Sequence, residues 1–232
     1  MAKDLVDKIR FVIIPRKLLE SNTALFNTYM YIASNSFKNT FKTTITLNKL
    51  AEQMGIGIKY VKQNVNDLIN QGYIMASEPY IKKNGKKGAI TFELYSVAVH
   101  YVILPIEIAT SKEIPTNFKH YYANLKYETN VNTMIAYYSP NELKKLLRPF
   151  GNPLGRSTYY EFINFIKNYK ISDIPLLADE STESEYRLIL KYEQYVYQVN
   201  KNSKIIKDDK QRVKETIAKL GGVDNYKAGV VI

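Results

Sequence analysis

The chain has 232 residues, of which 45% are hydrophobic, and its formal net charge is +11. A chain of this length accommodates two domains of about 100 residues each. The absence of cysteine excludes a disulfide framework, a thiolate metal site and a cysteine nucleophile. The excess of lysine favours an anionic partner, most often nucleic acid.

No run of about 18 apolar residues occurs, so the sequence predicts no helix that spans a membrane. The first ten residues, MAKDLVDKIR, contain acidic residues and no apolar region. We therefore expect no signal peptide. Together with the lack of cysteine, these features predict a cytoplasmic protein.

Residues 11–96 predict one α+β unit. FVIIPRKLLE predicts an extended segment that leads into a helix, and the apolar spacing of TALFNTYMYIAS predicts a longer helix. The β-branched TTITL predicts a short strand, followed by two helices over residues 48–54 and 58–71 that a glycine turn separates. Gly72 is expected to end the second of these helices. Two strands follow, with Asn84-Gly85 as a hairpin signal between them.

Helix, strand, helix, glycine turn, helix and hairpin is the order of elements in winged helix-turn-helix proteins. The segment LNKLAEQMGIGIKYVKQNVNDLINQGYI resembles that family, and FVIIPRKLL resembles the start of winged-helix domains in phage and plasmid replication proteins. The resemblance implies that the second helix enters the major groove of DNA with its N-terminal residues at base edges. Winged helices also serve as protein-interaction modules, so the fold alone does not decide the function.

The second helix carries the candidate residues of the first DNA site. Its predicted inward face consists of Ile58, Val61, Val65, Leu68 and Ile69. The side chains directed away from that face are Lys59, Tyr60, Gln63, Asn66 and Asp67, with Lys62 on the flank. Glutamine and asparagine can pair with adenine, and lysine can reach guanine or phosphate. The candidate DNA contacts are therefore Lys59, Tyr60, Lys62, Gln63 and Asn66. An ordinary solvated helix face is the alternative interpretation.

The predicted hairpin is strongly basic. KKNGKKG places four lysines close together without an acidic residue, namely Lys82, Lys83, Lys86 and Lys87. Four like charges repel one another, and a polyanion would neutralise them. We therefore predict a phosphate-binding wing, with simple solubility as the alternative.

The same order of elements recurs after residue 100. YVILP repeats FVIIP, and residues 117–138 predict a helix. Ser139, Pro140 and Glu142 predict a capping box, and Thr158 with Glu161 predicts a second one at the start of TYYEFINFIKNYK. IPLLADE and EYRLILKYE would be the wing strands on either side of STES. This recurrence predicts two tandem winged-helix domains, although chance similarity of two helical patterns remains an alternative.

The second copy differs from the first in its charge. Its helix offers a second set of candidate DNA contacts, which are Arg156, Ser157, Tyr160, Asn164 and Lys167. Its wing, however, contains four acids and would be repelled by phosphate; they are Asp179, Glu180, Glu183 and Glu185. This wing would therefore face a protein or point away from DNA.

The sequence thus predicts an α+β fold with three parts. Residues 1–98 form an N-terminal winged-helix domain with a basic wing, and residues 99–198 form a C-terminal winged-helix domain with an acidic wing. Residues 199–232 form a charged C-terminal helix and tail, with seven bases and three acids over residues 200–220.

The motifs of common active sites do not occur. His100 and His120 are too far apart for a His-x-His metal pair, and no phosphate-binding loop, GxGxxG, HExxH or GxSxG motif is present. We therefore expect neither enzymatic activity nor a cofactor or metal.

These features predict a sequence-specific double-stranded DNA-binding protein. The resemblance implies a plasmid or phage replication initiator that binds repeats in an origin, forms a homodimer and recruits a host replication or transcription protein. A transcriptional regulator of a mobile element is one alternative. A tandem winged-helix scaffold for protein assembly is another, although such scaffolds tend to be acidic.

Overall fold

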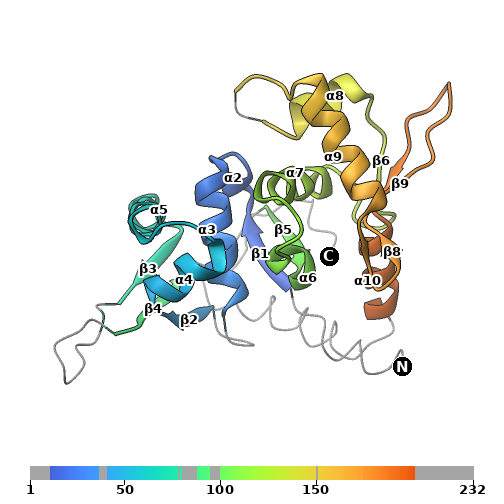
Figure 1. Cartoon of the computed structure of the whole chain (residues 1–232). Helices are drawn as coiled ribbons and strands as arrows, with labels where there is room; N and C mark the ends of the chain where they lie inside the picture. The colour runs from blue at the N-terminus through green and yellow to red at the C-terminus, as the bar shows by residue number, and fades with distance from the viewer. Residues whose placement is uncertain are drawn as a thin grey trace, which may run out of the picture. The chain divides into compact units, whose positions relative to one another are not determined.

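The computed structural model describes residues 11–36, 41–77, 79, 88–94, 100–149 and 151–201 (Figure 1). They form an α+β fold, as the sequence predicts. Contacts within the chain define two compact units, the first of which is Arg10–Ala123. The described residues of the second unit begin at Asn124.

The division between the units falls inside helix α7 (Thr116–Tyr127), whereas the sequence places a boundary at residues 98–99. His120 on α7 explains the difference, because its side chain is buried in the first unit. Its Nε2 donates to the carbonyl oxygen of Leu19 at 2.8 Å, and its ring stacks on Phe26 at 4.3 Å. Burial lowers the pKa of His120, which favours the neutral ring that this arrangement needs.

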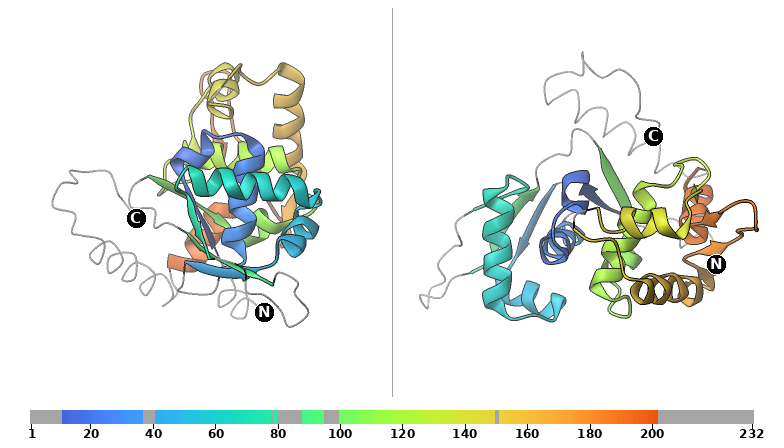
Figure 2. Two further views of the ribbon diagram at one scale, coloured as in Figure 1. Left: turned by 90° about the vertical axis from the view of Figure 1, so that its left-hand side faces the viewer. Right: turned by 90° about the horizontal axis from the view of Figure 1, so that it is seen from above.

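The first unit contains a three-stranded antiparallel sheet with the order β2-β4-β3. Its elements run in the order α3 (Thr23–Ser34), β2 (Lys42–Ile45), α4 (Leu47–Met54), α5 (Ile58–Asn70), β3 (Ile74–Ala76) and β4 (Ile90–Leu94). Thr43 and Ile45 on β2 are buried, and Phe92 and Leu94 on β4 are buried as well. This alternation gives the sheet one buried face, as expected for half-buried strands. Helices α3, α4 and α5 pack against one another (Figure 2).

Local signals set the ends of the two helices α4 and α5. The Thr46 side chain accepts from the backbone nitrogen of Lys49 at 3.1 Å and caps α4. Gly55 ends α4 with φ of 66°, and Gly72 follows α5 with φ of 73°. Glycine adopts these left-handed conformations without a steric penalty. The predicted role of Gly72 is therefore confirmed.

The two related pentapeptides FVIIP and YVILP pair with each other. Strand β1 (Phe11–Pro15) and strand β5 (Tyr101–Pro105) form an antiparallel two-stranded sheet in which Ile13 lies opposite Ile103. Each strand ends in a proline, and a short helix follows directly, namely α2 (Arg16–Leu19) after β1 and α6 (Ile106–Thr110) after β5. Because the central residues of both pentapeptides face each other, the two segments occupy equivalent positions in the pair.

Lys119 on α7 is buried in the first unit with 1% of its surface exposed. Its ammonium donates to the carbonyl oxygen of Ala109 at 3.0 Å and to the hydroxyl of Tyr31 at 3.3 Å. No carboxylate of the described residues forms an ion pair with it. Burial of this charge lowers the pKa of Lys119 to about 8.

We expect the stability of the first unit to rise between pH 8 and about 10 because of Lys119. The folded pKa is about 8, whereas a lysine in an unfolded chain titrates near 10.4, so the unfolded state binds more protons in this window. Urea unfolding at pH 8 and pH 9.5 measures the effect. The variant Lys119→Met should lose this rise, and an equal rise in the variant would assign it to another group.

The second unit contains a sheet with the order β6-β10-β9 and a separate hairpin formed by β7 and β8. Its elements after α7 are β6 (Ile135–Ala136), α8 (Pro140–Leu146), α9 (Arg156–Asn168), β7 (Lys170–Ile171), β8 (Ile174–Pro175), β9 (Ala178–Asp179), β10 (Leu188–Ile189) and α10 (Lys191–Lys201). The capping box of Ser139 and Glu142 at the start of α8 is present, as predicted.

Three predicted elements of the second unit differ from the structure. Helix α7 ends at Tyr127, because Asn130 accepts two backbone hydrogen bonds through its side chain and starts a turn that leads into β6. Helix α9 begins at Arg156 with Gly155 as its N-cap, so Thr158 and Glu161 form no capping box. Helix α10 begins at Lys191, inside the segment predicted as a wing strand. Residues 202–232, which hold most of the predicted tail helix, lie outside the described residues.

Candidate nucleic-acid interface

Helix α5 presents all of its predicted DNA contacts on the exposed side. Val61, Val65 and Leu68 are buried and hold the helix against the first unit. The predicted contacts are exposed; they are Lys59, Tyr60, Lys62, Gln63 and Asn66. Tyr60 is the most exposed large hydrophobic residue among those described, at 64%. Two cations and two side-chain amides therefore share one face that is open to a partner.

The buried stripe of α5 is narrower than predicted. Ile58 and Ile69 are 38% and 37% exposed, because they lie in the first and last turns of the helix, beyond the ends of the buried stripe. Asn64 is half-buried and donates to the hydroxyl of Thr28 on α3 at 3.0 Å. Asp67 is half-buried rather than directed outward. The exposed face of α5 therefore contains no fully exposed acid.

The four lysines of the predicted basic wing lie outside the described residues; they are Lys82, Lys83, Lys86 and Lys87.

Helix α9 also exposes its candidate residues, which are Arg156, Ser157, Tyr160, Asn164 and Lys167. The guanidinium carbon of Arg156 lies 5.8 Å from the ring centroid of Tyr160, a cation–π contact on the first turn. Lys167 lies 3.5 Å from the carboxylate of Asp179, so it already has an anionic neighbour within the protein. Arg156 is therefore the stronger candidate for a phosphate or base contact on this helix.

Bases from neighbouring elements partly neutralise the acidic wing. Glu180 lies 3.1 Å from the ammonium of Lys191 and 3.8 Å from the guanidinium of Arg187. Burial raises the pKa of Asp179, but hydrogen bonds from Ser181 and the nearby Lys167 ammonium outweigh it, so the pKa is lowered overall. Two of the four wing acids are thus engaged within the second unit.

Helices α5 and α9 have closely similar starts. Each has 13 residues, and each follows a glycine N-cap, Gly57 or Gly155, with φ near −60° and ψ of 142° or 153°. Neither has an acidic residue in its first turn or a side chain that caps it. No side chain therefore caps the first backbone N–H groups of either helix, and the helix dipole favours an anion at this end.

Glu161 is a surface residue of α9 that the sequence prediction assigned to a cap. Its Oε1 accepts from the hydroxyl of Ser157 at 2.9 Å, one helical turn earlier. The signal that could have revealed this is Gly155, which corresponds to Gly57 before α5.

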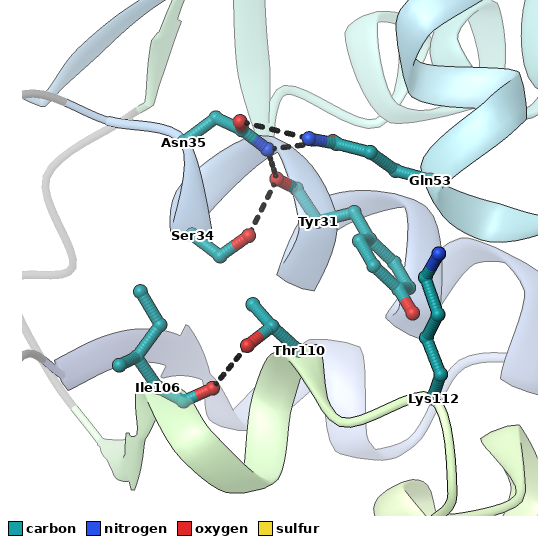
Figure 3. A pocket seen from close by; sticks show the side chains of 7 residues that line it. All are labelled: Tyr31, Ser34, Asn35, Gln53, Ile106, Thr110 and Lys112. Atoms are coloured by element: carbon teal, nitrogen blue, oxygen red, sulfur yellow. Dashed lines mark hydrogen bonds between the residues drawn. The ribbon is translucent and has the colours of Figure 1, made fainter.

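A pocket of about 330 Å³ lies in the first unit (Figure 3), and none of its lining residues belongs to α5. Its lining residues are Tyr31, Ser34, Asn35, Gln53, Ile106, Thr110 and Lys112. Asn35 and Gln53 exchange two amide hydrogen bonds of 2.9 and 3.2 Å, which join α3 to α4. Most of its polar groups thus bond one another, and Lys112 supplies its cation.

The part of the chain that the structure describes contains no group of three His, Asp or Glu residues able to hold a metal ion. None of its helices combines the length and apolar character needed to cross a membrane. No protein-family model matches the chain, and no curated protein sequence is significantly similar to it.

Proposed function

We propose that this chain is a sequence-specific double-stranded DNA-binding protein made of two winged helix-turn-helix units. The observation that carries the proposal is a repeated topology. In the first unit, α3-β2-α4-α5-β3-β4 has the sheet order β2-β4-β3. After α7, the chain runs β6-α8-α9-β7-β8-β9-β10 and forms a sheet with the order β6-β10-β9, so the β7-β8 hairpin is an addition to the shared order. Helix α7, which corresponds to α3 in chain order, lies mostly in the first unit. In both, the last helix before the final two strands of this sheet has 13 residues and carries the exposed candidate contacts.

Electrostatics supports nucleic acid as the partner. The chain carries +11, and the exposed face of α5 contains two lysines and two side-chain amides without a fully exposed acid. Lysine binds phosphate or guanine, and glutamine and asparagine pair with adenine. A helix of this composition at the surface suits the major groove of DNA.

Within this class, we propose replication initiation at a plasmid or phage origin as the biological role. Two DNA-reading units in one chain suit repeated sites, and the resemblance of FVIIPRKLL to replication proteins points the same way. A transcriptional regulator would use the same surfaces at a promoter. The location of the bound repeats separates these roles, because an initiator protects an origin and a regulator protects only a promoter.

Protection of DNA by the purified protein across a salt series tests the proposal. The DNA should include the coding region of the chain and the repeats upstream of it. Protection over about two helical turns that persists at physiological salt supports both units reading DNA. Protection over about one turn at a promoter favours the regulator. Retention that is weak and lost with salt, with no defined footprint, would contradict specific recognition and favour the scaffold.

Gln63→Ala is expected to weaken binding to the DNA site found by protection by about 1–3 kcal/mol and to leave binding to random DNA nearly unchanged. The reason is that Gln63 is exposed at the centre of the outward face of α5 and can pair with a base edge. Fluorescence anisotropy titrations with both DNAs measure the difference. Gln71→Ala is the matched control, because Gln71 is exposed just beyond the same helix. Equal losses on both DNAs would show that Gln63 reads no base.

A further inference from the structure

The residues of α5 and α9 correspond position by position when the residue after each N-cap glycine, Ile58 or Arg156, is counted as the first. The fourth, eighth and eleventh residues are buried in both, which are Val61, Val65 and Leu68 in α5 and Tyr159, Ile163 and Ile166 in α9. Equal burial at equal positions means that the two helices turn the same face toward their own units. Their outward positions can therefore be compared directly.

The sixth residue of each helix lies nearly opposite the buried stripe, because residues follow one another at 100° around a helix. This residue is Gln63 in α5 and Glu161 in α9, and both are exposed. The ninth residue is asparagine in both, Asn66 and Asn164, and both are exposed. The outward faces thus share an asparagine at the ninth position, but at the sixth position one carries an amide and the other a carboxylate.

An acid at this position needs an explanation other than helix capping. Gly155 is the N-cap of α9, so Glu161 lies beyond the first turn and caps nothing. Among the residues that the structure describes, Glu161 forms no salt bridge. Its hydrogen bond from Ser157 instead orients an exposed carboxylate, with one oxygen engaged by the hydroxyl.

Glutamate and glutamine read different bases. Glutamine can donate to and accept from adenine in the major groove, whereas a carboxylate accepts only and pairs with the amino group of cytosine. Arg156, on the first turn of the same helix, supplies a cation that offsets repulsion between Glu161 and the phosphates. Glu161 can therefore face the major groove favourably only where a nucleobase donates a hydrogen bond to its carboxylate.

We propose that Glu161 and Gln63 are the specificity-determining pair of the two units, with Glu161 selecting cytosine and Gln63 selecting adenine at equivalent base pairs. The inference rests on the proposed DNA-binding function. Ser157 acts as a positioning residue that fixes the Glu161 carboxylate. Asn66 and Asn164 then provide the part of the readout that both units share.

Selection from a randomised double-stranded DNA library with the full chain tests this assignment. Wild type, Glu161→Gln and Gln63→Glu are compared, and Glu183→Gln serves as a control because Glu183 is an exposed acid on the wing loop outside α9. Glu161→Gln should convert one preferred cytosine to adenine, and Gln63→Glu should convert one preferred adenine to cytosine. The change in preference at that base pair should be about tenfold. Glu183→Gln should select the same sequence as wild type.

Two results would overturn the assignment while leaving DNA binding in place. One is an unchanged base preference in Glu161→Gln. The other is a gain in affinity for all sequences alike, which would show that Glu161 only repels phosphate. Failure of the wild type to enrich any sequence would instead reject the proposed function itself. Ser157→Ala should reduce the preference for cytosine without changing which base is preferred.

Discussion

Glu193→Ala is expected to lower the free energy of unfolding of the second unit by about 3–5 kcal/mol. The side chain of Glu193, on α10, is only 2% exposed and forms an ion pair with Lys126 on α7, whose side chain is 12% exposed. Loss of the carboxylate would leave a largely buried lysine charge without its ion-pair partner. Chemical denaturation followed by circular dichroism measures the loss.

A double substitution separates the ion pair from simple loss of packing. Replacing Lys126 and Glu193 together with methionine should recover most of the stability, because two apolar side chains of similar volume need no charge compensation. A loss below about 1 kcal/mol in Glu193→Ala would show that the pair contributes little. A double variant no more stable than Glu193→Ala would show that packing, rather than charge, causes the loss.

The first unit could be predicted well because its local signals agree with its burial. Helix α3 has the predicted bounds, and Gly55 and Gly72 end α4 and α5 where the sequence indicates. Strands β2 and β4 follow their β-branched and aromatic residues. What the sequence could not show is that β5 and α6 complete this unit. Strand pairing between residues 11–15 and 101–105 and the burial of His120 depend on distant contacts that periodicity does not encode.

The second unit was harder to predict because its strands are short and because the sequence offers two possible N-caps for α9. Strands β6, β9 and β10 have two residues each, too few to show an alternating pattern. Thr158 and Glu161 have the spacing of a capping box, but Gly155 caps α9 instead. Tyr192 and Val196 are buried at helical spacing, so tertiary packing favours α10 where β-prone residues indicate a strand.

The sequence predicted which residues of the candidate site are exposed, but it did not predict the ion pairs around them. Every predicted contact on α5 and α9 is exposed, because the buried stripe of each helix defines the opposite face. The pairing of Lys167 with Asp179 and of Glu180 with Lys191 joins residues that lie 11 or more positions apart, so it required the structure. These pairs partly neutralise the acids of the second wing, so the wing opposes the proposed DNA binding less than the sequence indicates.

Replacing Lys82, Lys83, Lys86 and Lys87 together with glutamine is expected to reduce DNA affinity on the order of a thousandfold at about 0.1 M salt. Each lost phosphate contact removes the release of about 0.9 counterion, so the slope of log affinity against log salt should fall by about three to four. Anisotropy titrations between about 50 and 200 mM salt measure both quantities.

A second variant with equal charge shows whether position or total charge matters. Replacing Lys17, Lys112, Lys145 and Lys170 with glutamine also lowers the net charge from +11 to +7, and all four side chains are exposed outside α5, α9 and the wings. A DNA-contacting wing predicts a large loss in the first variant and a small one in this control. Equal small losses would mean that the lysines provide only solubility. Phosphate contacts depend on where each lysine lies, whereas long-range attraction to a polyanion depends on the charge wherever it lies. Unchanged affinity in both variants would therefore exclude both effects, remove the main electrostatic argument for DNA and favour a protein partner.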